Sequence, residues 1–261
     1  MRIPIYQVDA FTGRLFHGNP AAVCPLESWL PEELLQAIAA ENNLSETAFF
    51  VRQGERYRLR WFTPEVEVKL CGHATLAAAF VIFDRLEPEA ERVVFDTLSG
   101  ELAATRDGKL LVLDFPAKPP QPCEPPPGLL EALGGEPIDV LKADYFLVTY
   151  ENEEAVGRLR PDFCALAGLR TPVIVAAPGE EADFVSRFFA PAYGINEDPV
   201  TGSAHCTLIP FYAQRLGKSR LRARQLSRRG GELVCEHQGD RVTMAGEAVL
   251  YMEGTITLAT D

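Results

Sequence analysis

A short pattern occurs twice in this chain of 261 residues, once in each half. Residues 60–64 read RWFTP, and residues 187–191 read RFFAP. After a spacing that is three residues longer in the second copy, residues 201–204 (TGSA) align with residues 71–74 (CGHA), and an apolar stretch follows each. Self-similarity of this kind indicates a duplicated structural unit. We therefore expect two related halves, each with a sheet wrapped on one buried helix.

Both predicted helices, residues 72 to about 86 and residues 202–216, begin at a glycine, Gly72 and Gly202. A glycine lets the backbone approach a ligand closely. The free N–H groups and the positive dipole end at a helix start attract an anion. Two related halves would place the two helix starts on either side of one cleft, so we expect a small carboxylate to bind there.

A proline-rich segment divides the chain. Seven of the twelve residues from 116 to 127 are proline, which removes N–H donors and fixes φ, so this segment is neither a central strand nor a helix. It is expected to link an N-terminal lobe, residues 1–115, to a C-terminal lobe, residues 128–251. The last strand, around residues 252–261, can return to the first lobe, and the sequence leaves its placement open.

Composition excludes several classes of partner. The net charge of −12 argues against nucleic acid or an anionic membrane as the main partner, because both require a surplus of positive surface. No apolar run approaches the roughly 20 residues of a membrane span, and the N-terminus carries no export signal. The six cysteines have no regular spacing typical of a disulfide framework. We expect a cytoplasmic protein.

One stretch, residues 215–229, departs from the acidic average with seven basic residues and no acid. Leu221 and Ala223 alternate there with arginines at positions 220, 222 and 224. This alternation is typical of a strand with one solvated face. We therefore favour a strand over a phosphate-binding patch.

The first candidate for chemistry is Glu46, the one acid in the apolar segment of residues 44–50 (LSETAFF). A carboxyl group partly removed from water is suited to accept and return a proton near neutral pH. The alternative is that Glu46 and its neighbour Ser45 only cap or turn the preceding helix.

The other candidates lie at the two helix starts. Cys71 and His73 flank the first glycine, and Asp198, Thr201 and Ser203 surround the second. They could face a ligand together with the backbone N–H groups. The alternative is a structural role, with a buried thiol, a capping imidazole and ordinary residues of a first helical turn.

A zinc site built from Cys71, His73, His205 and Cys206 is disfavoured. The spacings are irregular for zinc, and adjacent helical residues such as His205 and Cys206 diverge by about 100°. The sequence also lacks GxGxxG, GxxxxGK[ST], GxSxG and HExxH motifs. We expect neither a metal nor a cofactor.

At these motifs the chain resembles the phenazine-biosynthesis-like (PhzF-like) isomerase family, which shares the diaminopimelate epimerase fold. The resemblance extends over essentially the whole chain, in the segments 6–12 (YQVDAFT), 18–23 (GNPAAV), 44–48 (LSETA), 71–75 (CGHAT), 159–163 (LRPDF) and 197–204 (EDPVTGSA). It implies an α+β fold of two pseudo-symmetric lobes, each a curled β-sheet around a central α-helix. It further implies a homodimer and a biosynthetic, cofactor-free isomerase that works by acid–base proton transfer.

The resemblance also assigns roles to individual residues. Glu46 matches the proton-shuttling glutamate of the family, and His73 and Asp198 match its two supporting polar residues. Ser203 matches a substrate-contacting hydroxyl, and the glycines at the two helix starts match those that hold the substrate. Thr201, beside the second glycine, is expected to take part in substrate binding, as is Cys71 beside the first.

Two alternatives stay open. A racemase or epimerase of this fold needs two thiols, and Cys71 aligns with Thr201, whose hydroxyl is far too weak an acid. Cys206 lies about 140° around the helix from Thr201, so it is a poor substitute. A thiol-dependent enzyme would therefore need an unidentified second base. The second alternative is a non-catalytic protein that binds a small acid.

Overall fold

The computed structural model describes residues 1–258. The chain divides into two compact units, one formed by Met1–Asp114 together with the segment from Ala245 onward, and the other by Phe115–Met244. The proline-rich segment 116–127 lies in the second unit, and β18 (Ala248–Thr257) lies in the first. Residues 259–261, which belong to the range expected for the last strand, lie outside the described residues.

The first unit is a sheet packed around helix α2. Its elements are β1 (Arg2–Ala10), β2 (Asn19–Leu26), α1 (Glu32–Asn42), β3 (Glu46–Gln53), β4 (Arg56–Phe62), β5 (Glu67–Val68), α2 (Gly72–Val81), η1 (Ile82–Leu86), β6 (Arg92–Thr97), β7 (Gly100–Asp107), β8 (Leu110–Pro116) and β18. β1 pairs antiparallel with both β18 and β2, whereas β2 pairs parallel with β3. Every residue of α2 except Phe80 is buried, as expected for a helix that is apolar on all faces.

The helix predicted from residue 72 to about 86 changes its hydrogen-bonding pattern near the end. The α-helix ends at Val81, and a π-helical turn, η1, continues it to Leu86. Apolar periodicity does not distinguish these two geometries, because the extra residue of a π turn shifts the face by only part of a turn.

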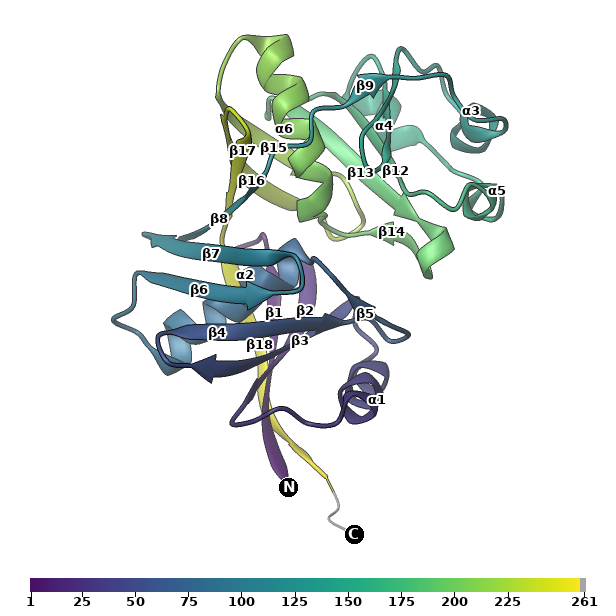
Figure 1. Cartoon of the computed structure of the whole chain (residues 1–261). Coiled ribbons are helices and arrows are strands. Elements are labelled where there is room, and N and C mark those ends of the chain that lie inside the picture. Colours follow the sequence, from purple (N-terminus) through teal and green to yellow (C-terminus); the bar gives the residue numbers. More distant parts are fainter. Residues whose placement is uncertain (259–261) are drawn as a thin grey trace. The chain divides into compact units, whose positions relative to one another are not determined.

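The second unit repeats the plan around helix α6. Its elements are β9 (Gln121–Pro122), α3 (Leu129–Leu133), β10 (Val140–Lys142), β11 (Phe146–Thr149), α4 (Glu153–Arg158), α5 (Phe163–Gly168), β12 (Val173–Pro178), β13 (Phe184–Ala190), η2 (Pro191–Tyr193), β14 (Ile195–Asp198), α6 (Gly202–Leu216), β15 (Arg220–Gln225), β16 (Gly231–Gln238) and β17 (Arg241–Gly246). Helix α6, drawn in light green in Figure 1, contacts β15 and β16. It spans the residues that the sequence predicted.

The internal repeat reappears as matching topology. β4 pairs antiparallel with β5 and parallel with β6, the strand that follows α2. β13 pairs antiparallel with β14 and parallel with β15, the strand that follows α6. In each unit, therefore, one strand is flanked by the short strand that leads to the buried helix and by the strand that follows it.

The repeat extends to one pair of side chains in each unit. Nε of Arg60 lies 2.7 Å from Glu67, and Nε of Arg187 lies 2.7 Å from Glu197. Each guanidinium binds both carboxylate oxygens of its partner. Each also lies over the aromatic ring two residues further along its own strand. The two arginines are the first residues of the repeated pattern seen in the sequence.

The basic stretch forms the predicted strand, β15. Leu221 and Ala223 are buried, Arg220 and Arg222 are exposed, and Arg224 is half-buried. Of the helices within residues 1–258, none is long and apolar enough to span a bilayer.

Candidate functional site

In the first unit, three of the predicted site residues meet at the start of α2. Glu46 is the first residue of β3, Cys71 immediately precedes α2, and His73 is its second residue. Nε2 of His73 lies 3.0 Å from Oε2 of Glu46. Sγ of Cys71 lies 3.5 Å from Nδ1 of the same imidazole. The imidazole of His73 therefore contacts both the carboxylate and the thiol.

A fourth residue, Asn19, fixes the orientation of this imidazole. Nδ2 of Asn19 lies 3.1 Å from Nδ1 of His73, and both side chains are buried. When Nδ1 accepts the amide hydrogen, the hydrogen of the neutral ring is on Nε2. In the protonated ring, Nδ1 can donate to the Cys71 sulfur. In both states Nε2 carries a hydrogen, and the distance from Nε2 to Oε2 of Glu46 is 3.0 Å.

Burial and neighbouring charge shift the pKa of His73 in opposite directions. Burial alone lowers its pKa, but the neighbouring Cys71 and the Glu46 carboxylate raise the pKa well above the ordinary value. The pKa of the Cys71 thiol is raised to about 11, mainly by burial and then by Glu46. Near neutral pH the thiol is therefore protonated, and Glu46 is the group that supplies a negative charge beside His73.

Glu46 is shielded without being sealed from solvent. Its Oε2 atom is buried against His73, whereas 13% of the side chain as a whole is exposed. The Glu46 side chain therefore keeps a small solvent-exposed surface. The flanking strand residues Ala48, Phe49 and Phe50 are buried, as the apolar sequence around Glu46 predicted.

In the second unit, Asp198 and Thr201 form a tight turn before α6. The hydroxyl of Thr201 donates to Oδ2 of Asp198, and both residues are buried. Gln225, the last residue of β15, joins the two ends of this turn. Its Oε1 accepts the Thr201 N–H at 2.9 Å, and its Nε2 donates to the Asp198 carbonyl oxygen at 2.8 Å.

Ser203 lies in the first turn of α6. Its hydroxyl contacts a side chain from the segment between β10 and β11. The hydroxyl of Tyr145 donates to Oγ of Ser203 at 3.2 Å. The Tyr145 ring packs edge-on against Phe188, with 5.1 Å between ring centroids. Burial raises the pKa of Tyr145, so its hydroxyl stays protonated as a donor.

His205 and Cys206, which the sequence considered as zinc ligands, bond to their own helix. Nδ1 of His205 donates to the Thr201 carbonyl at 2.8 Å, and burial lowers the pKa of His205 to about 4. The Cys206 thiol contacts the Gly202 carbonyl at 3.8 Å, and burial raises its pKa to about 12. Both side chains therefore stabilise the first turns of α6.

Among residues 1–258, one group has three metal-ligand side chains close together, Glu46, Cys71 and His73, whose ligand atoms lie within 4.8 Å of one another. A zinc ion takes one imidazole nitrogen per histidine. In this group Sγ of Cys71 lies 3.5 Å from Nδ1, and Oε2 of Glu46 lies 3.0 Å from Nε2. The spacing of the three side chains is compatible with a metal ion.

The structure thus forms two clusters from the predicted residues, with Gly72 and Gly202 as the first residues of the helices beside them. Asn19, Tyr145 and Gln225 also belong to these clusters, and no sequence pattern above singled them out. A signal existed for Gln225, because the alternation that buries Leu221 and Ala223 also places it on the inner face of the strand.

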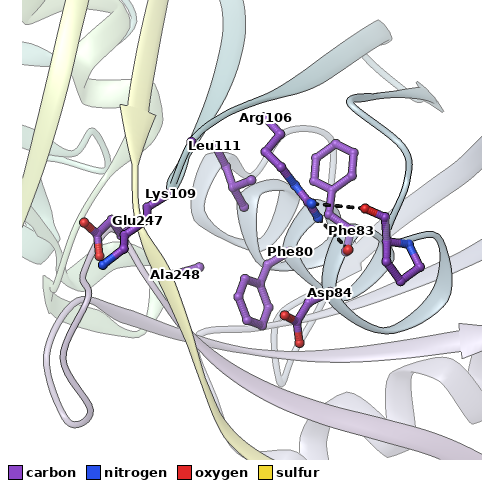
Figure 2. A pocket seen from close by; sticks show the side chains of 10 residues that line it. Phe80, Phe83, Asp84, Arg106, Lys109, Leu111, Glu247 and Ala248 are labelled. Carbon is purple, nitrogen blue, oxygen red and sulfur yellow. Dashed lines mark hydrogen bonds between the residues drawn. The ribbon is translucent and has the colours of Figure 1, made fainter.

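A cavity of about 370 Å³ in the first unit lies at the other end of α2. Phe80, Phe83 and Arg106 line it, and Figure 2 shows the Arg106 guanidinium bonded to backbone carbonyl groups beside it. Glu46, Cys71 and His73 are not among its lining residues, so this cavity is separate from the cluster at the helix start.

The chain is similar to known proteins over almost its whole length. The family model described as phenazine biosynthesis-like protein matches residues 8–254. An uncharacterized isomerase of Pseudomonas aeruginosa is 56% identical over 259 residues, covering 99% of this chain and 100% of its own length. A crystal structure of a PhzF-family phenazine biosynthesis protein from Enterococcus faecalis superimposes with a TM-score of 0.96 at 48% identity, over 99% of this chain and 100% of that one.

A more distant structure has the same fold. A predicted epimerase from Pseudomonas aeruginosa superimposes with a TM-score of 0.76 at 22% identity, over 98% of this chain and all of its own. The α+β architecture predicted from the sequence, that of the diaminopimelate epimerase fold, is confirmed.

Proposed function

Because the chain belongs to the phenazine biosynthesis-like protein family, we propose that it is an isomerase that transfers a proton within a small carboxylate substrate. The 56% identical relative is named an isomerase over its full length, which supports the reaction class. The observation that carries the mechanism is the contact between Glu46 and His73 at the start of α2.

Glu46 acts as the acid–base group. Its carboxylate accepts a proton from a carbon of the substrate, and the electron pair of that C–H bond moves into the adjacent unsaturated system. Glu46 then returns the proton to another carbon, where a new C–H bond forms. No electrons leave or enter the substrate, so the step needs no redox cofactor.

His73 orients the carboxylate and stabilises its charge. Its Nε2 lies 3.0 Å from Oε2, so the other oxygen is the one that we expect to exchange the proton with the substrate. Asp198 takes the second supporting role, either orienting a polar group of the substrate or balancing transient charge. This role requires that the substrate contact both helix starts at once, which stays a prediction.

Each helix start can hold a carboxylate group of the substrate. Gly72 and Gly202 begin α2 and α6, and the first N–H groups of a helix favour an anion. Ser203 adds a hydroxyl. It accepts the Tyr145 hydrogen, so its own hydrogen is available for the anion.

The thiol alternatives are less favourable. Cys71 is protonated near neutral pH, and its counterpart Thr201 already donates its hydroxyl hydrogen to Asp198. A racemase with two thiol bases therefore lacks its second base at the equivalent position. A non-catalytic binder of small acids would use the helix starts. Binding alone would not require the Glu46–His73 contact.

Exchange of substrate hydrogen with solvent tests the proposal. A panel of small hydroxy-, amino- and enol-acids is incubated with the protein in D₂O and followed by ¹H NMR. We expect loss of one carbon-bound proton signal from at least one acid with the wild type, and loss of that exchange in the Glu46→Gln variant. Equal exchange by wild type and variant would remove Glu46 from the mechanism, and no exchange with any acid would favour the binder.

Three further features stay predictions. The resemblance predicts a homodimer and a biosynthetic role, and the composition predicts a cytoplasmic location. All six cysteines are free thiols, which is compatible with a reducing compartment. Light scattering coupled to size-exclusion chromatography tests the dimer.

A further inference from the structure

We propose that Gln225 is a positioning residue for this reaction, because it fixes the turn that carries Asp198 and the first residues of α6. The inference rests on the proposed function, since it concerns the residues that would support the proton transfer. Gln225 lies 27 residues from Asp198 in sequence and only 1% of it is exposed.

The side-chain amide of Gln225 uses all of its polar atoms on this turn. Oε1 accepts the N–H of Thr201, and Nε2 donates both to the carbonyl oxygen of Asp198 and to Oγ1 of Thr201 at 3.1 Å. Reversing the amide would place oxygen against two acceptors and nitrogen against a donor. The contacts therefore define one orientation, and a buried amide held in this way is costly to disturb.

The bonds continue from Gln225 through Thr201 to the carboxylate. The Thr201 hydroxyl accepts from Gln225 and donates its one hydrogen to Oδ2 of Asp198. A hydroxyl has a single hydrogen to donate, so that of Thr201 is already used within the protein. Thr201, which the sequence placed among the substrate-binding residues, therefore acts through Asp198 and does not donate to a substrate.

The fold explains why Gln225 can reach this turn. β13 pairs with β14 on one side and with β15 on the other, and β14 ends at Asp198 while β15 ends at Gln225. The ends of these two strands meet at the start of α6. The glutamine thus ties the strand before the helix to the strand after it, at the point where Asp198 must be held.

Two variants of Gln225 test the proposal with the acid that the wild type exchanges in D₂O. Gln225→Met removes the polar atoms at similar size. Gln225→Glu keeps the shape but replaces both N–H donors by a carboxylate that faces two acceptors. For both we expect kcat to fall by roughly 10²-fold, the scale of a misplaced group, with KM changed far less.

The pH profile separates positioning from a general loss of structure. Protonating the introduced carboxyl of Gln225→Glu restores one O–H donor, so its exchange rate relative to the wild type should recover as the pH falls, while Gln225→Met shows no such recovery. Gln238→Glu, at the exposed end of β16, is the matched control and should follow the wild-type profile.

A second pair of variants addresses the case in which the Gln225 variants do not fold. Thr201→Val removes the hydroxyl that links Gln225 to Asp198, and Thr201→Ser retains it. We expect Thr201→Val to lose kcat and Thr201→Ser to recover most of that loss. Equal activities for these two variants would overturn the proposal.

The outcomes also distinguish this inference from the proposed function. Full exchange activity in folded Gln225→Met and Gln225→Glu would overturn the role of Gln225 and leave the isomerase standing. A wild type that exchanges none of the acids would overturn the proposed function, and the role of Gln225 with it.

Discussion

Oε2 of Glu46 and Nε2 of His73 lie 3.0 Å apart at the start of the buried helix α2. The strand that begins with Glu46 and the helix that contains His73 are separated in sequence, so this contact depends on the fold of the first unit. It brings a carboxylate and a buried imidazole into ion-pair distance. The proposed proton transfer depends on this pair.

Replacing Glu46 by Gln removes the proposed base with little change of shape. We expect kcat/KM for the exchanging acid to fall by roughly 10²–10⁴-fold, the usual contribution of a positioned acid–base group. Glu55→Gln, at an exposed turn, is the matched control and should behave as the wild type. NMR-detected exchange in D₂O measures both, and a loss of less than tenfold in Glu46→Gln would contradict the assignment.

The raised pKa of His73 predicts a pH-dependent contribution to stability. Because its folded pKa exceeds its unfolded value of about 6.5, the contribution is fully present below that pH and is lost as the pH rises through the folded pKa. The free energy of unfolding of the wild type should therefore approach that of His73→Gln as the pH rises above neutrality. Urea unfolding at several pH values checks this, and a gap that widens with rising pH would argue against a protonated His73.

Cys71 is expected to matter less than Glu46. A thiol with a pKa of about 11 supplies little thiolate near neutral pH, so Cys71→Ser should reduce kcat/KM by less than about tenfold. The measurement is the same exchange assay, with circular dichroism to show that the variant folds. A folded but inactive Cys71→Ser would favour the thiol-dependent racemase.

The Tyr145 hydroxyl is predicted to strengthen substrate binding. Tyr145→Phe keeps the ring against Phe188 and removes the hydrogen bond to Ser203, which frees that hydroxyl to turn away from an anion. We expect KM to rise about fivefold, the equivalent of a hydrogen bond worth about 1 kcal/mol, with kcat little changed. Tyr193→Phe, at an exposed position, is the control, and a fall in kcat alone would refute this role for Tyr145.

We expect the repeated pair Arg187–Glu197 to contribute more to the free energy of unfolding than the surface pair Arg56–Glu101. The side chains of Arg187 and Glu197 are 10% and 22% exposed, whereas those of Arg56 and Glu101 are both 51% exposed. Removing one partner of a buried pair costs about 3–5 kcal/mol, and removing a surface partner costs about 1 kcal/mol or less. Glu197→Ala should therefore destabilise the protein by about 3 kcal/mol and Glu101→Ala by under 1 kcal/mol, as measured by urea unfolding. Equal losses would show that the repeated pair is not structural.

Local sequence patterns predicted the elements that carry the site. The glycine before each apolar run located the start of α2 and of α6, and the alternation in residues 220–224 predicted the strand β15 with its solvated arginines. These features depend on neighbours within a few residues, so periodicity and turn chemistry suffice to find them. The π-helical end of α2 was missed, because apolar spacing does not reveal hydrogen-bond registry.

By itself, the sequence determined the duplicated plan, the two helix starts and the residue types that gather near them. The tertiary structure alone decided which side chains meet: Asn19 with His73 across 54 residues, Tyr145 with Ser203 across 58, and Gln225 with Thr201 across 24. Such contacts depend on strand register and on how a buried helix packs against its sheet. A shift of one residue in the register of β2 or β15 would turn Asn19 or Gln225 to the opposite face, and local propensity carries no information about that choice.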